Sequence, residues 1–151
     1  MRRFVFRLDR VLDLRQREEK ERARELGRAL RAERSRKEAL EEAEEKLGRC
    51  GEQISETAEA GVTQAGVLHN LDLAIKAAAG EVEAAEESHQ KACEEVETEK
   101  TRFGEARKGR RVVERLKERR RAQWSVDESR QEQREFDDVA QLRLRRTAEE
   151  G

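Results

Sequence analysis

The sequence contains no proline and no tyrosine, and it has one tryptophan and four phenylalanines among 151 residues. Without proline, the strongest helix breaker is missing. Because aromatic and β-branched residues are scarce, strands are disfavoured. Apolar residues make up only 34% of the chain, against about half in an average globular domain. These absences exclude a broad hydrophobic core.

Long apolar runs are also missing. No stretch approaches the roughly 18 residues needed to span a bilayer. The opening MRRFVFRLDR is basic, but it lacks the apolar segment of about 7–15 residues found in signal peptides. Cys50 and Cys93 have no CxxC spacing, which is typical of a reducing compartment. We therefore expect a cytoplasmic protein without a transmembrane segment and without a disulfide.

Motifs for catalysis are absent as well. The chain has no Walker-type loop, no GxGxxG and no GxSxG. His89 and Cys93 stand four residues apart on one predicted helix face, but two ligands make only half of a zinc site. His89 is better interpreted as a polar seam residue that fixes helix register, and His69 is expected to be solvated. We predict no enzyme activity, no cofactor and no metal.

Charged residues, by contrast, are abundant at 46% of the chain. Such a composition fits either a disordered chain or a long helical rod with a narrow apolar seam. Alanine, glutamate, lysine, leucine and arginine dominate, as they do in coiled coils. Since proline is absent, the sequence favours the helical rod.

Apolar residues recur every seven positions in both halves of the chain, as in a left-handed coiled coil. Two lines in the first half are Leu26, Glu33, Leu40, Leu47, Ile54 and Ala29, Arg36, Ala43, Cys50, Thr57. Two lines in the second half are Leu68, Ile75, Val82, His89, Val96, Phe103 and Leu71, Ala78, Ala85, Ala92, Glu99, Ala106, Val113. The frequent alanines indicate two helices that lie close together.

Between the two halves lies AEAGVTQAG, residues 58–66, where Gly61 and Gly66 indicate a turn. We predict a helix over about 3–58, a turn over 59–66 and a second helix over 67–147. The fold class is therefore all-α, a single antiparallel coiled-coil hairpin spanning residues 1–151. Paired residues should have numbers that add to about 122–124, so Ile54 would meet Leu68. Residues from about 123 onward would overhang.

The predicted overhang carries an unusual apolar face. In REFDDVAQLRLRR, residues 134–146, Phe136, Val139 and Leu142 recur at a helical spacing; we call these three residues the C-terminal stripe. With Trp124, they are expected to have no partner in the chain, and an exposed apolar stripe marks a docking surface. The alternative interpretation is self-association or a frayed tail.

Charge is sorted along the chain although the net charge is only −1. Residues 109–122 carry seven basic and two acidic side chains, and residues 2–22 carry eight basic and five acidic ones. Residues 81–99 carry eight glutamates and one lysine. A hairpin would place both basic segments at the end that holds the termini, although charged flanks are also common in coiled coils.

Three segments of the chain form a recognisable set: FRLDRVLDLRQREEKERARELG at the start, VLHNLDLAIKAA after the turn, and REFDDVAQLR near the end. Together they resemble the FliJ family of flagellar export proteins. The related stalk proteins of virulence-type secretion look similar. The resemblance implies a two-helix coiled coil in the pore of a hexameric flagellar export ATPase. It also implies contacts with the cytoplasmic domain of the export gate and with export chaperones, at the inner membrane periphery.

Carried over by position, the resemblance places the end with the termini inside the ATPase ring. The implied ring-contacting residues are Leu8, Val11, Leu12, Leu14, Arg119, Arg120, Arg121, Trp124, Phe136, Val139 and Leu142.

The resemblance assigns the export gate to a face just past the turn, at Val67, Leu71 and Ala74. This chain departs from the family there, because Gly61, Gln64 and Val67 stand where the family often has aromatic residues.

Two other classes of protein compete with the export stalk. In the first, the arginine-rich segment would bind nucleic acid through phosphates, which predicts a steep loss of affinity with salt. The acidic residues 81–99 argue against it, so no nucleic-acid partner is expected. The second is a purely structural coiled-coil spacer, which would not require the C-terminal stripe.

Overall fold

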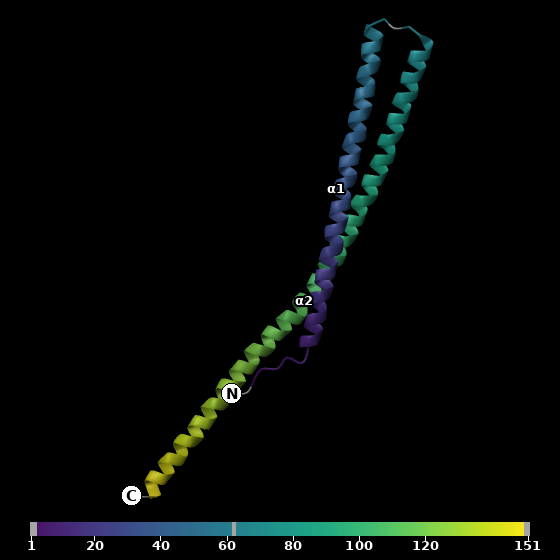
Figure 1. The fold of residues 1–151 in the computed structure, drawn as a ribbon. Coiled ribbons are helices and arrows are strands. Elements are labelled where there is room, and N and C mark those ends of the chain that lie inside the picture. The colour runs from purple at the N-terminus through teal and green to yellow at the C-terminus, as the bar shows by residue number, and fades with distance from the viewer. Residues whose placement is uncertain (1–2, 62, 150–151) are drawn as a thin grey trace. The chain divides into compact units, whose positions relative to one another are not determined.

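Two long helices make up nearly all of the structure. The computed structural model describes residues 3–61 and 63–149, with side chains up to Arg146. Helix α1 spans Asp9–Glu59 and α2 spans Ala65–Glu149, with 51 and 85 residues. The two helices run in opposite directions (Figure 1), and no strand occurs among the described residues. The predicted all-α antiparallel hairpin is confirmed.

The connection between the helices depends on a glycine. Gly61 has φ of 70°, a backbone conformation that costs glycine little because it has no Cβ. Its N–H donates to the carbonyl of Ala58 at 3.1 Å, which closes the end of α1. At the other side, the Gln64 carbonyl accepts from Val67 and Leu68 at 3.0 and 3.2 Å. Gly66 is therefore the second residue of α2 and not part of the turn; Val62 lies outside the described residues.

Helix α1 begins later than predicted. It starts at Asp9, whose N–H donates to the carbonyl of Phe6 at 3.2 Å. Residues 3–8 precede the helix and are not helical; we call them the N-terminal strap. None of the described helical stretches is long and apolar enough to cross a membrane.

The chain divides into two compact units, which we describe separately. The hairpin unit comprises Lys20–Glu105, and the termini unit comprises the described residues up to Glu19 and those from Ala106 onward. In the hairpin unit, α1 and α2 lie side by side, and the turn connects them at one end (Figure 1).

The core of the hairpin unit is a seam of the predicted heptad residues. Its buried apolar members are mostly alanines, which let two helix backbones approach closely; they are Ala29, Ala78, Ala92 and Val96. The larger residues of the same lines are half-buried, as expected for a seam with only two helices. They include Leu26, Leu40, Leu47, Ile54, Ile75 and Val82. Leu68, in the first turn of α2, is exposed instead, since few neighbours surround it there.

Side-chain pairs across the seam report its register. His89 Nε2 lies 2.9 Å from Glu33 Oε1, and these residue numbers add to 122, as predicted. Lys46 donates to Glu81 at 2.8 Å. These numbers add to 127, a few residues from the predicted register, and the two long side chains can span that offset. The pair of His89 and Glu33 agrees with the predicted register, and the buried apolar residues of this unit all belong to the predicted heptad lines.

Candidate functional site

The termini unit contains a contact that the sequence analysis missed. Phe6 of the N-terminal strap is buried, and Lys117 Nζ of α2 lies 5.9 Å from its ring centroid. Phe4 packs on Trp124 with ring centroids 5.9 Å apart and the planes tilted by 51°. The prediction that Trp124 has no partner in the chain is therefore wrong. The apolar alternation of Phe4 and Phe6 was the available signal, because residues two apart share one side of an extended segment.

Ion pairs hold the two segments of the termini unit together. Lys117 Nζ lies 2.6 Å from Asp9 Oδ1 at the start of α1. Further along, Arg110 binds the carboxylates of Glu19 and Glu114. The hydrogen bond that Arg110 donates to Glu19 is the main cause that raises the pKa of Arg110, which remains a cation at any ordinary pH. The pairs of Lys117 with Asp9 and of Arg110 with Glu19 join α1 to the basic stretch of α2.

A groove lies between the N-terminal strap and α2. Its volume is about 740 Å³, and its lining combines aromatic, aliphatic and charged groups. Phe4, Leu8, Leu116, Arg120, Trp124 and Asp127 are among its lining residues. Leu8, Arg120 and Trp124, which the sequence analysis assigned to one binding end, are thus brought together by the fold.

The other predicted ring-contacting residues near the N-terminus, Val11, Leu12 and Leu14, differ in their surroundings. Leu12 is buried in the termini unit, with Phe6 and Ala106, so its side chain serves the core. Val11 and Leu14 are exposed. Of the four predicted residues near the N-terminus, Leu8, Val11 and Leu14 therefore offer apolar surface to a partner.

The basic residues that follow are open to solvent. Arg119, Arg120 and Arg121 are all exposed. Among the described residues, none of the three forms an ion pair. This arginine triplet is therefore available to acidic groups of another molecule.

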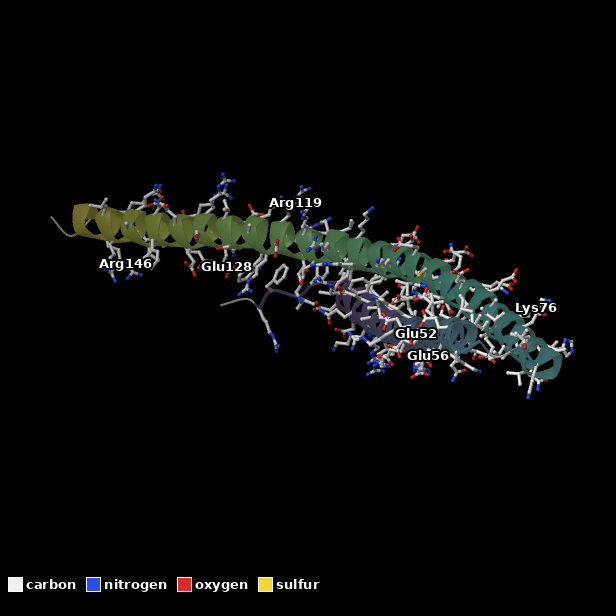
Figure 2. The ribbon with its side chains drawn as sticks, turned by 90° about the horizontal axis from the view of Figure 1, so that it is seen from above. Glu52, Glu56, Lys76, Arg119, Glu128 and Arg146 are labelled. Atoms are coloured by element: carbon white, nitrogen blue, oxygen red, sulfur yellow. The ribbon has the colours of Figure 1, made fainter. Side chains whose placement is uncertain are left out.

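Beyond Trp124, α2 continues as an exposed helix. Every residue from Ser129 to Arg146 is exposed. Past Glu128 and as far as Arg146, no other described part of the termini unit runs beside α2 (Figure 2). The C-terminal stripe leaves 76%, 48% and 60% of Phe136, Val139 and Leu142 accessible. Three exposed apolar side chains on one helix face form a surface suited to a protein partner.

The predicted gate-binding residues lie in the hairpin unit near the turn. Val67 and Ala74 are exposed, and Leu71 is half-buried against the seam. Leu68 and Leu73 add exposed apolar surface to the same two turns of α2. This patch is apolar and contains no aromatic side chain.

Comparisons with known proteins agree with this architecture. A family model described as Flagellar FliJ protein matches residues 4–149 of the chain. A search among curated proteins finds no match, and a search among solved structures finds none. Because the family model covers nearly the whole length, the chain belongs to the flagellar FliJ family, a family of flagellar protein export.

Proposed function

We propose that the protein is a non-catalytic stalk of the flagellar export apparatus. Its termini unit enters the ring of a hexameric export ATPase, and its hairpin unit contacts the cytoplasmic domain of the export gate. It also escorts export chaperones, and it acts in the cytoplasm at the inner membrane. The proposal assigns no cofactor and no catalytic residue.

The exposed C-terminal stripe is the observation that carries this proposal. Burying one such apolar side chain against a partner contributes roughly 1.5–3 kcal/mol. An exposed ion pair contributes only about 0–1 kcal/mol. The stripe therefore supplies the affinity for the ring, while the arginine triplet orients the helix toward acidic groups and speeds association.

The test measures ATP hydrolysis by the purified export ATPase with and without this chain. One variant changes Phe136, Val139 and Leu142 to alanine, which keeps helix propensity high. We expect it to lose most of the stimulation. The matched control changes Arg134, Asp137 and Gln141 to alanine on the opposite face of the same helix, and it should stimulate normally.

Two further results decide the roles of the charged and apolar groups. Changing Arg119, Arg120 and Arg121 to alanine should reduce stimulation less than the loss of the stripe. That reduction should shrink at high salt, because salt screens exposed charges. If the stripe variant stimulates the ATPase as well as its control does, the exposed end of α2 is not the ring-binding element and the proposal fails.

The gate contact is a separate part of the proposal, supported by the exposed Val67 and Ala74 beside the half-buried Leu71. Val67→Glu and Ala74→Glu should each weaken binding to the purified gate domain, since a charge would be buried at an apolar contact. The control is Ala79→Glu, an exposed position on another side of α2. If Val67→Glu, Ala74→Glu and Ala79→Glu all bind the gate domain with the same affinity, the gate does not contact this surface.

A further inference from the structure

Three side chains with metal-binding atoms meet in the middle of the hairpin unit. His89 Nε2 lies 2.9 Å from Glu33 Oε1, and Cys93 Sγ lies 3.5 Å from His89 Nε2. One ligand atom from each residue falls within 4.8 Å of the other two. All three residues are half-buried, so the cluster is partly shielded from water while a small ion can still reach it.

The fold completes a set of ligands that the sequence leaves incomplete. His89 and Cys93 share one face of α2 because they are four residues apart. Glu33 belongs to α1 and reaches the same point only because the two helices pair in this register. A half-site on one helix thus becomes a three-ligand site across the seam.

The spacing suits a small ion with tetrahedral coordination. Zinc lies about 2.0–2.1 Å from histidine nitrogen and about 2.3 Å from cysteine sulfur, so ligand atoms around it are about 3.3–3.6 Å apart. The sulfur–nitrogen distance of 3.5 Å already matches this range. The nitrogen–oxygen distance of 2.9 Å must widen slightly, which small rotations of these half-buried side chains can provide.

The ligand atoms also select the class of metal. Calcium and magnesium prefer sites built from oxygen. A thiolate with an imidazole favours zinc and neighbouring transition metals, and one carboxylate is compatible with both. Three protein ligands leave a fourth position for water.

We propose that Glu33, His89 and Cys93 bind one zinc ion, which clamps α1 to α2 in the hairpin unit. The inference does not rest on the proposed function. A metal that bridges both helices binds the folded hairpin in preference to the unfolded chain, and so it stabilises the fold. Without a metal, the same groups form only the hydrogen bond between His89 and Glu33 and a weak contact from the thiol.

The test titrates the reduced, full-length chain with Zn²⁺ and, separately, with Co²⁺. Calorimetry with Zn²⁺ should give one ion per chain, and the melting temperature should rise with zinc concentration. Cobalt should produce the intense thiolate-to-metal absorption band of a cysteine-bound ion, with visible bands typical of tetrahedral coordination.

The chain supplies its own matched controls, because it has only two cysteines and two histidines. Cys93→Ser, His89→Gln and Glu33→Gln should each weaken zinc binding at least about tenfold, and Cys93→Ser should abolish the thiolate band. Cys50→Ser and His69→Gln should leave the zinc affinity and the thiolate band unchanged. Circular dichroism checks that each variant remains helical, and Co²⁺ titration of any less stable variant is repeated at low temperature.

Two outcomes would overturn the proposal. One is the absence of stoichiometric zinc binding to the reduced wild-type chain. The other is binding that survives in the Cys93→Ser and His89→Gln variants, or that is lost in Cys50→Ser or His69→Gln, since either result would place the ion elsewhere.

Discussion

Neighbouring residues of the N-terminal strap have opposite surroundings. Phe6 is 7% exposed under Lys117, whereas Val5 is 75% exposed. The strap is not helical, so consecutive side chains point to different sides and only one of them meets α2. Phe6 therefore contributes to stability in a way that its sequence neighbour does not.

We expect Phe6→Ala to lower the free energy of unfolding of the termini unit by about 1.5–3 kcal/mol, because a nearly complete apolar burial is lost. The measurement is urea unfolding followed by the fluorescence of Trp124, the single tryptophan of the chain. Val5→Ala is the control and should change stability by less than about 0.5 kcal/mol. Equal effects of the two substitutions would contradict the burial of Phe6.

Glu99 is as deeply buried as Phe6, although its side chain is charged. It is 8% exposed and occupies a predicted seam position. Its Oε1 accepts a hydrogen bond from Arg102 at 2.6 Å, but its Oε2 is buried without a hydrogen-bond partner in the described part of the chain. A buried polar atom without a partner costs about 1–3 kcal/mol.

Glu99→Leu should therefore raise the free energy of unfolding of the hairpin unit by about 1–3 kcal/mol. The lost pair with Arg102 offsets little of this gain, because the arginine is half exposed. Glu95→Leu, at an exposed position of the same helix, should have almost no effect. Thermal unfolding followed by circular dichroism distinguishes the two variants, and a destabilised Glu99→Leu chain would show that the carboxylate is fully satisfied.

At the scale of the helix, three consecutive alanines show how narrow the seam is. Ala78 is 1% exposed, while Ala77 and Ala79 are both exposed. Because a helix turns by about 100° per residue, only the middle alanine faces α1. Its small side chain sets how closely the two helix backbones approach.

Ala78→Leu should destabilise the hairpin unit by about 1–3 kcal/mol, since extra methylene groups in a closely packed seam force the helices apart. Ala77→Leu and Ala79→Leu make the same chemical change on exposed faces and should cost only a few tenths of a kcal/mol. Unfolding of the three variants under one condition provides the comparison. If all three behave alike, the helices do not approach closely at Ala78.

For the whole molecule, the main asymmetry is that α2 has 85 residues and α1 has 51. The extra length of α2 carries the C-terminal stripe, whose three side chains are exposed. The chain thus combines a segment that folds on itself with a helix whose apolar face is open to a partner.

Deleting residues 129–151 should leave the unfolding midpoints of Trp124 fluorescence and of helicity nearly unchanged. The physical reason is that Ser129–Arg146 is exposed throughout and adds little burial. The total helical signal should fall with the number of residues removed. A clear drop in the midpoint would indicate that this segment is covered in solution, and sedimentation of the full chain would show whether a second copy covers it.

The sequence by itself determined that the chain forms two long helices, a turn at Gly61 and an apolar seam between them. Gly61 marks the end of α1, and the heptad lines include Ala29, Ala78, Ala92 and Val96, all of which are buried. These features follow from local physics, because helical periodicity and the conformational freedom of glycine act over a few residues. The exposure of the C-terminal stripe followed in the same way from the unequal lengths of the two halves.

Only the tertiary structure decided which distant residues meet. The N-terminal strap was predicted as helix, but packing of Phe6 and Phe4 on α2 competes with helix formation, and no local pattern reports that competition. The predicted register placed Glu33 opposite His89, but only the packed side chains show that the ligand atoms of Glu33, His89 and Cys93 come within 4.8 Å of one another. The physical reason is that such contacts depend on the alignment of segments far apart in the chain, where a shift of one residue would bring a different side chain to the same point.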